Sequence, residues 1–165
     1  MGPTLRLLDR DAGESVFDTN PQLSTIWSKE ATKEVRKATG KWCGGGDGEI
    51  LLVMLGQDIV GITGWYDVGD DGIPPQAEIG LRWHGVIPQV RRRGISRTAL
   101  GHLARRLPRH AEYLYEVAPR DHSKIIEYFC NLGFEPYVKP RMLENLRYVA
   151  DKVVLRCPVP LLRIL

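Results

Sequence analysis

Cysteines are scarce in this sequence, and their placement excludes two kinds of small stabilised domain. The 165 residues include only Cys43, Cys130 and Cys157. An odd number of widely spaced cysteines, with no Cys-x-x-Cys pair and no nearby pair of histidines, predicts neither a disulfide framework nor a zinc site. We therefore expect three buried thiols and no bound metal.

Long apolar runs and targeting signals are absent as well. The longest uninterrupted apolar run covers residues 50–55, whereas a helix that spans a bilayer needs about 20 apolar residues. The N-terminus has no basic region followed by an apolar stretch, and Arg6 stands where a myristoylation signal needs Ser or Thr. These absences predict a cytoplasmic protein with no membrane contact.

The composition itself is that of an ordinary folded domain. Hydrophobic residues make up 43% of the chain and charged residues 26%, with a formal net charge of +3. This supplies enough apolar surface for a full core and argues against a disordered chain. Because no internal repeat or linker divides the sequence, we expect a single domain over residues 1–165.

Acidic residues are missing from one long segment. Residues 79–111 contain eight arginines and no Asp or Glu. The rest of the chain therefore has 23 − 8 = 15 basic groups against 20 acidic ones, a balance of −5. Such a local excess of positive charge predicts a binding site for an anion.

Hydrophobic periodicity and turn residues predict the elements of the N-terminal half. Residues 4–8 are expected to form a short strand, and residues 9–40 to be helical, with Pro21 near the start of a second helix. Strands over 49–55 and 59–66 form a hairpin. The glycine-rich residues 41–48 lack a Gly-Lys-Ser/Thr ending, so we interpret them as a turn rather than a phosphate loop.

The strand expected over residues 77–87 carries three polar side chains of interest. Alternation puts Glu78, Arg82 and His84 on one face and the apolar residues 79, 81 and 83 on the other, unless a β-bulge shifts the count. A helix over 96–107, a strand over 112–117 and a helix over 123–132 are expected to follow. Strands near 134–138 and 148–157 complete the predicted order.

The loop between this strand and the next helix has the features of a phosphate site. Residues 91–96 read Arg-Arg-Arg-Gly-Ile-Ser, and the first amides of a helix, together with its dipole, attract an anion. Gly94 leaves the turn without a side chain, and Ser96 is suited to cap the helix. We expect backbone amides here to hold a pyrophosphate.

Two motifs resemble those of the GNAT N-acetyltransferases. Residues 86–96, VIPQVRRRGIS, are similar to motif A, in which a Val-x-Pro strand end precedes Arg/Gln-x-x-Gly-x-Gly/Ala. Glu116-Val117, and then residues 125–134 ending in YFCNLGF, resemble the motif B strand and helix, which close with Tyr-x-x-x-Gly-Phe. The order and spacing of both motifs fit, and the resemblance covers about residues 77–137.

This resemblance implies a fold and a cosubstrate. The fold class is α/β (α+β), a mixed and mostly antiparallel sheet of about six or seven strands. About four helices would flank the sheet, which is splayed between its fourth and fifth strands. Acetyl-CoA would lie with its pyrophosphate against the amides of residues 92–96 and its pantetheine arm along the end of the fourth strand, where an amide near Val86 would stabilise the oxyanion. The residues implied to contact it are Val86, Ile87, Arg91, Arg92, Arg93, Gly94, Ile95, Ser96, Arg97, Thr98, His122 and Phe129.

Three residues depart from the family pattern. Ser96 replaces the last small residue of the phosphate loop, and His122 stands where the family often has Asn. Phe129 occupies the position of the Tyr that protonates the departing thiolate. Because phenylalanine has no proton to donate, this third departure bears on catalysis.

The resemblance also implies catalytic candidates. Glu78 is our choice of base because it resembles the Ala-Glu-Ile strand carboxylate of some GNAT enzymes; an exposed carboxylate paired with Arg82 is the structural alternative. His84 is a second candidate, with a structural histidine as its alternative. Tyr128 and Tyr137 are candidate acids in place of the missing tyrosine, or ordinary half-buried tyrosines.

These features leave three functions open. The first is acetyl transfer from acetyl-CoA to a primary amine. A positively charged amine would be attracted by an acidic rim of Asp67, Asp70, Asp71 and Glu78. The second is a weak or inactive module that binds an acyl-CoA or a protein partner, which Phe129 favours. The third is a nucleic-acid surface over residues 91–109, which lacks interleaved aromatic side chains. A homodimer is left open.

Overall fold

A seven-stranded mixed sheet, in the order β1-β2-β3-β4-β5-β7-β6, organises the molecule. The computed structural model describes residues 1–165 except 10, 43–47, 68–78 and 138–150. The strands are β1 (Thr4–Leu7), β2 (Gly48–Leu55), β3 (Asp58–Asp67), β4 (Ile79–Val86), β5 (Tyr113–Pro119), β6 (Glu135–Pro136) and β7 (Lys152–Pro158). This confirms the predicted mixed, mostly antiparallel architecture.

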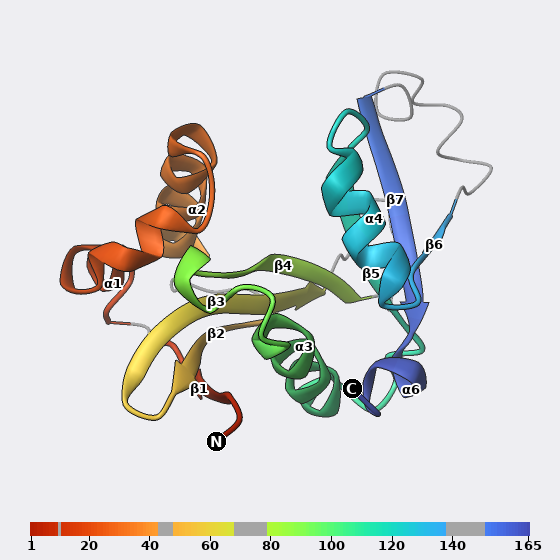
Figure 1. The fold of residues 1–165 in the computed structure, drawn as a ribbon, viewed down its shortest axis with the longest axis horizontal. Coiled ribbons are helices and arrows are strands. Elements are labelled where there is room, and N and C mark those ends of the chain that lie inside the picture. The colour runs from red at the N-terminus through yellow and green to blue at the C-terminus, as the bar shows by residue number, and fades with distance from the viewer. Residues whose placement is uncertain (10, 43–47, 68–78, 138–150) are drawn as a thin grey trace.

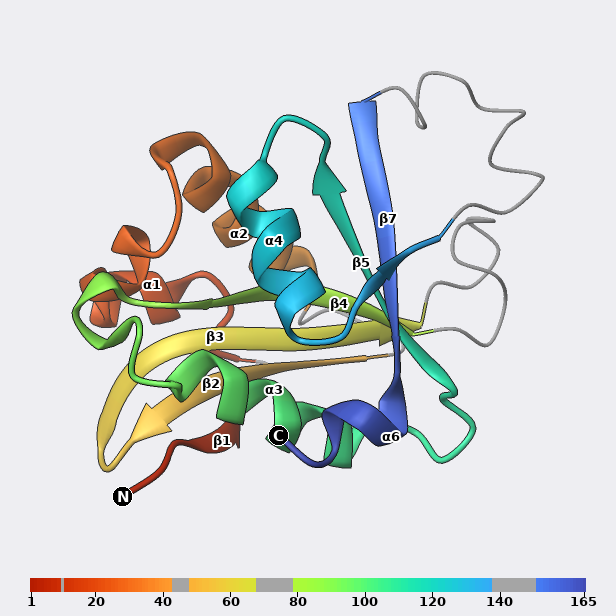
Figure 2. The same ribbon diagram turned by 45° about the vertical axis from the view of Figure 1, so that its right-hand side comes forward.

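The sheet opens between its fourth and fifth strands. β4 and β5 are the one parallel pair among the described strands, and they pair at only two positions, Ile79 with Leu114 and Gly80 with Tyr115. Beyond these positions the two strands diverge, as both views show (Figures 1 and 2). The predicted splay is therefore present, and among the described strands it leaves the edges of β4 and β5 without a neighbour in the middle of the sheet.

Helices cover both faces of the sheet. In Figure 1, α1 (Ser15–Thr19) and α2 (Lys29–Trp42) lie across the sheet from α3 (Ile95–Arg106), and α4 (Ser123–Asn131) lies beside β5 and β7. The short helix α6 (Val159–Leu162) packs near α3. A 3₁₀ turn, η1 (Pro21–Thr25), stands where a second long helix was expected, and a second one, η2 (Pro88–Val90), follows β4. Within the described residues, no helix is long and apolar enough to cross a membrane.

Two hydrophobic clusters hold these helices on the sheet, and α3 contributes residues to both. One joins residues of α1, η1 and α2 to β2, β3 and the end of β4. The other joins α3, α4 and α6 to β5 and β7, with the start of β4. Cys157 is buried in the second cluster as expected, but Cys130 on α4 is exposed, so the expectation of a buried thiol was wrong there. Cys43 lies outside the described residues.

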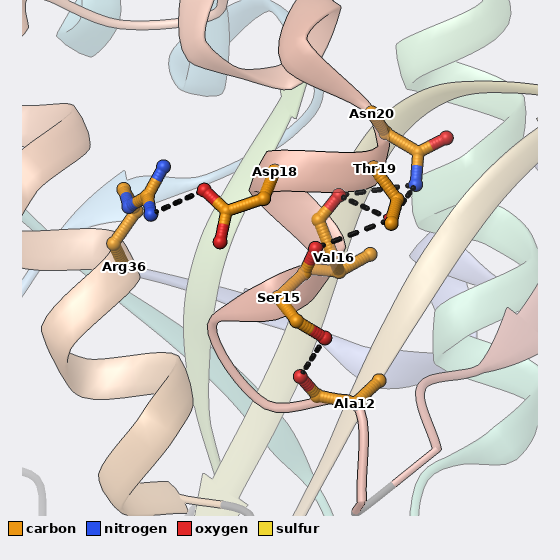
Figure 3. A network of polar contacts seen from close by, with 7 residues as sticks. All are labelled: Ala12, Ser15, Val16, Asp18, Thr19, Asn20 and Arg36. Carbon is orange, nitrogen blue, oxygen red and sulfur yellow. Dashed lines mark hydrogen bonds and ion pairs between the residues drawn. The ribbon is translucent and has the colours of Figure 1, made fainter.

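Polar contacts fix the short N-terminal helix in place. The Asp18 carboxylate accepts a hydrogen bond of 2.8 Å from the Arg36 guanidinium and so connects α1 to α2 (Figure 3). At the end of α1, the Asn20 side-chain amide donates to the Val16 carbonyl at 3.0 Å, which satisfies one of the last carbonyls of the helix. The two N-terminal helices are thereby tied to each other.

A β-bulge in β4 changes the predicted facing of its side chains. Arg82 pairs with Gly64 and Gly85 with Ile62, so Trp83 and His84 together lie opposite Thr63 on β3. Trp83 has a φ of 45°, which marks the irregular residue. Beyond the bulge the alternation of side chains is reversed. His84 consequently does not share a face with Arg82, and the uninterrupted alternation was wrong at this point.

Candidate functional site

The turn between β4 and α3 leaves backbone amides available to an anion. Gly94 is the N-cap of α3 and has a φ of 75°, in the left-handed region that glycine favours. In the described chain, the first amide that bonds back into the helix is that of Thr98, which donates to the Gly94 carbonyl at 2.9 Å. The preceding amides and the positive end of the helix dipole lie where the sequence predicted an anion site, and the binding of an anion there stays a prediction.

The arginines of this turn have different surroundings. Arg92, Arg93 and Arg97 are exposed around the helix start. The Arg91 guanidinium instead donates to the Ile26 carbonyl at 2.6 Å and to the Val86 carbonyl at 3.3 Å. Arg91 therefore ties the end of β4 to the N-terminal segment, and its side chain is already engaged within the protein.

The end of β4 has an edge directed into the splay. The Ile87 amide donates to the Val60 carbonyl on β3 at 2.8 Å. Because amides alternate in direction along an extended strand, the amide of the preceding residue, Val86, points to the opposite edge, where β5 has diverged. That edge is suited to bind an extended ligand by backbone hydrogen bonds, as an added strand would.

A chain of four polar side chains crosses from β3 to α4 beneath this edge. The Thr63 hydroxyl lies 3.0 Å from His84 Nδ1, and His84 Nε2 lies 2.8 Å from Ser96 Oγ. Ser96 Oγ in turn lies 2.6 Å from the Tyr128 hydroxyl. Ser96 thus bridges the two halves of the splayed sheet. The sequence suggested that Ser96 caps α3, but the N-cap is Gly94 and no side chain caps it.

Burial sets the protonation of this chain. Desolvation is the main effect and lowers the pKa of His84 to about 4, although the hydrogen bond with Ser96 acts to raise it. The imidazole is therefore neutral at pH 7, with one donor and one acceptor nitrogen. Burial also raises the pKa of Tyr128, against the effects of Ser96 and Arg97, so its phenol stays protonated.

Hydrogen-bond direction follows from this neutral state. In one of the two polarities that a neutral imidazole allows, Thr63 donates to His84 Nδ1, His84 Nε2 donates to Ser96, and Ser96 donates to Tyr128. The proton of the Tyr128 hydroxyl is then directed away from the chain. In this arrangement the chain is suited to supply a proton at its Tyr128 end.

Glu116 is a half-buried carboxyl-bearing residue that was not among the site residues expected from the sequence. It is the first residue of β5 beyond the last pair with β4, and it lies opposite Leu155 on β7. Alternation puts it on the face of Leu114, which packs in the same cluster as Phe129 of α4. Desolvation raises its pKa to about 8. The signal in the sequence was a charged residue at position 116 on the same strand face as the apolar Leu114 and Ala118.

Comparisons with solved structures agree with this geometry. An acetyltransferase from Thermus thermophilus is 18% identical, with 96% of this chain and 97% of that chain covered and a TM-score of 0.69. A protein from Desulfovibrio desulfuricans, described as a GNAT-family acetyltransferase, is 14% identical over 96% and 99% of the two chains, with a TM-score of 0.68. The chain has the GNAT fold. No protein-family model and no curated protein matches the sequence.

One further structure of this fold contains ligands. The aminoglycoside acetyltransferase AAC(6')-Ib, in complex with coenzyme A and kanamycin, is 12% identical over 97% of this chain and 96% of that chain, with a TM-score of 0.67. That structure contains coenzyme A and kanamycin together.

The motif B departures occupy defined places in this GNAT fold. Phe129 is buried at 4% exposure and packs edge-on between the rings of Tyr128 and Phe134, at centroid distances of 5.2 and 5.1 Å. The preceding residue, Tyr128, carries a hydroxyl that lies 2.6 Å from Ser96 Oγ. His122 is exposed at the N-cap of α4, and its carbonyl accepts hydrogen bonds from the first turn.

The remaining predicted residues do not all join this site. Tyr137 packs against Tyr115 at 5.7 Å, in a cluster separate from the Ser96 chain. Glu78 lies outside the described residues, as do Asp70 and Asp71, so their predicted roles stay predictions.

Proposed function

We propose that the protein is an N-acetyltransferase that moves an acetyl group from acetyl-CoA to a primary amine. The observation that carries this proposal is the combination of a splayed β4–β5 pair, a Val86 amide directed into the splay and the first amides of α3. Together these suit a ligand with an amide-rich arm and a pyrophosphate. The coenzyme A bound in AAC(6')-Ib supports the same assignment.

In the proposed reaction the neutral amine attacks the carbonyl carbon of the thioester. A carbon–nitrogen bond forms, the carbon–sulfur bond breaks, and the amine loses a proton to a base. The Val86 amide stabilises the oxyanion of the tetrahedral intermediate. Tyr128, whose hydroxyl is held by Ser96, donates its proton to the departing thiolate and is then reprotonated by solvent.

Among the catalytic groups, loss of the base would raise the reaction barrier most. An alkyl amine with a pKa of about 10.4 is mostly protonated at pH 7, and reaching its neutral form costs roughly 4.6 kcal/mol. Glu116, with a pKa raised to about 8, is matched to accept a proton near neutral pH. Glu78, the choice from the sequence, is the competing candidate.

The two carboxyl groups are distinguished by their replacement with glutamine. The glutamine variant of the residue that acts as the base should lose turnover. Its rate should also no longer fall as the pH is lowered, and its affinity for coenzyme A should be unchanged. Glu116→Gln and Glu78→Gln should therefore differ sharply in kcat/KM between pH 6 and 9. Equal profiles for both variants and the wild type would remove both carboxyl groups from the mechanism.

A second candidate function is acyl-CoA binding without turnover. It is favoured by Phe129, which replaces the expected proton donor and is committed to the core. Calorimetry with coenzyme A, together with thiol release from acetyl-CoA across a panel of primary amines, separates the two functions. Tight binding with no thiol released from any amine supports the second function and overturns the first.

A further inference from the structure

The side chains of Thr63, His84, Ser96 and Tyr128 carry one more proton than the hydrogen bonds between them use. Because burial lowers the pKa of His84 to about 4, its ring is neutral at pH 7 and has one N–H group. The three hydroxyls have one proton each, which makes four polar protons in the chain. Three contacts, of 3.0, 2.8 and 2.6 Å, connect the four groups. One proton is therefore left over, and it belongs to one of the two ends.

The tautomer of His84 decides which end has the extra proton. If Nδ1 carries the ring proton, Nδ1 donates to Thr63, Ser96 donates to Nε2, and Tyr128 donates to Ser96. The Thr63 proton is then left over. If Nε2 carries the ring proton, all three bonds reverse and the Tyr128 proton is left over. The two directions do not mix, because the single proton of Ser96 points either to His84 or to Tyr128.

The surroundings of the two ends favour the second arrangement. Thr63 on β3 is 0% exposed, and within the described residues its hydroxyl has no hydrogen-bond partner other than His84. A buried hydroxyl proton without an acceptor is unfavourable. Tyr128 is partly exposed on α4, so its proton can meet water or a ligand. The extra proton is thus at the Tyr128 end, and the ring proton of His84 is on Nε2.

The same chain lies close to the place proposed for the thioester. His84 and Val86 are two residues apart on β4, which is roughly 7 Å along an extended strand. Ser96 is the second residue of α3, in the turn whose amides are proposed to bind the pyrophosphate. The Tyr128 hydroxyl, 2.6 Å from Ser96 Oγ, therefore lies beside the part of β4 along which the arm of acetyl-CoA is proposed to run.

We propose that His84 is a positioning residue for the proton donor Tyr128. The Nε2–H group donates to Ser96 Oγ, so Ser96 donates to the phenol oxygen and the phenol proton is directed into the splay, toward the departing thiolate. Thr63 fixes the tautomer by donating to Nδ1. His84 itself exchanges no proton with the substrate, in contrast to its role as a candidate base in the sequence analysis. This inference rests on the proposed acetyl transfer.

Two replacements of similar size separate the N–H group from the rest of the ring. In His84→Leu the N–H donor is lost, Tyr128 donates to Ser96 instead, and that bond must break before the thiolate is protonated. We expect kcat for thiol release at pH 7 to fall about fivefold, the equivalent of one hydrogen bond, with KM for acetyl-CoA unchanged. His84→Gln keeps a side-chain N–H for Ser96 and should stay within about twofold of the wild type. His110→Leu, an exposed change in the turn before β5, is the matched control and should have no effect.

A double variant tells a positioning role from a structural one. In the Tyr128→Phe background no phenol proton remains to be directed, so adding His84→Leu should not lower kcat further. A purely structural role would slow both backgrounds by the same factor. Equal slowing in both backgrounds, no slowing by His84→Leu alone, or a His84→Gln rate as low as that of His84→Leu would overturn the inference.

NMR tests the orientation without relying on turnover. Long-range ¹⁵N–¹H spectra of the wild type identify the ring nitrogen that carries the proton, and the His84 signals are those missing from the spectrum of His84→Gln. A proton on Nε2 supports the inference, and a proton on Nδ1 overturns it, even where His84→Leu does not fold. If no amine releases thiol, the proposed acetyl transfer fails, and the tautomer still decides the direction of the Tyr128 proton.

Discussion

Replacing Tyr128 with phenylalanine removes the last hydroxyl of the chain that runs from Thr63 through His84 and Ser96. The change deletes a 2.6 Å hydrogen bond to Ser96 Oγ and keeps the ring that packs against Phe129. Ser96 retains its bond to His84, so no hydroxyl is left without a partner. The loss in stability should be about 1 kcal/mol, the net contribution of one hydrogen bond.

The kinetic effect can be estimated from the leaving group. A thiol with a pKa of about 8.5 lies about 1.5 units above pH 7, so its unassisted departure costs roughly 2 kcal/mol, or about a 30-fold lower rate. As the pH rises toward and beyond 8.5, the thiolate leaves without a proton and the advantage of the donor disappears. Burial raises the pKa of Tyr128, so the phenol itself remains protonated over this range.

The assay is thiol release from acetyl-CoA at pH 6.5 to 9, with the rate of wild type divided by that of Tyr128→Phe. We expect a ratio of about 30 at pH 7 that declines steadily toward unity. Glu127→Gln, an exposed change on the same helix, should give a ratio near one throughout. A Tyr128→Phe ratio that is constant with pH, or already near one at pH 7, would show that Tyr128 supplies no proton.

Three further results test the neighbouring features. Gly94→Ala should cost about 1 to 2 kcal/mol because φ is 75° there, and Gly94→Trp should abolish coenzyme A binding measured by calorimetry; unchanged affinity would contradict the proposed phosphate site. Arg91→Ala should cost about 1.5 to 3 kcal/mol in thermal unfolding through its lost bonds to carbonyls, and Arg91→Lys, lacking the planar fork, should not restore it. In denaturant titrations, the lowered pKa of His84 reduces stability as the pH falls from about 6.5 to 4, and the raised pKa of Glu116 reduces it as the pH rises from about 4.5 to 8. His84→Gln should remove the first slope and Glu116→Gln the second, and wild-type slopes in both variants would refute these assignments.

Regular elements and the phosphate turn were predictable from local sequence. The hairpin of β2 and β3, the helix ended before Pro108 and the strand of β5 follow from side-chain alternation and turn residues, which act over a few positions. The first helical region was less predictable. Pro21 begins a 3₁₀ turn there, and the main helix begins at Lys29, because packing against the sheet determines where a helix of modest propensity forms.

The site was only partly predictable, for a different reason. Tyr128 was among the candidates from the sequence, but its link to Ser96 depends on the approach of α4 to α3 across the splay. Glu116 could be noticed as a charge in an apolar strand, whereas its raised pKa depends on burial by segments distant in sequence. Glu78 stays a prediction.

The sequence by itself determined the order of most strands and helices, the placement of Gly94 at a helix start and the excess of positive charge around it; the C-terminal α6 was not predicted. These features depend on periodicity and on the conformations open to each residue, both of which are local. The tertiary structure decided which side chains meet. A bulge at Trp83 turned His84 toward Ser96, and the register of β5 with β7 brought Arg156 beside Tyr115. Such contacts depend on chain segments far apart in sequence, and short-range patterns carry no information about their distance or burial.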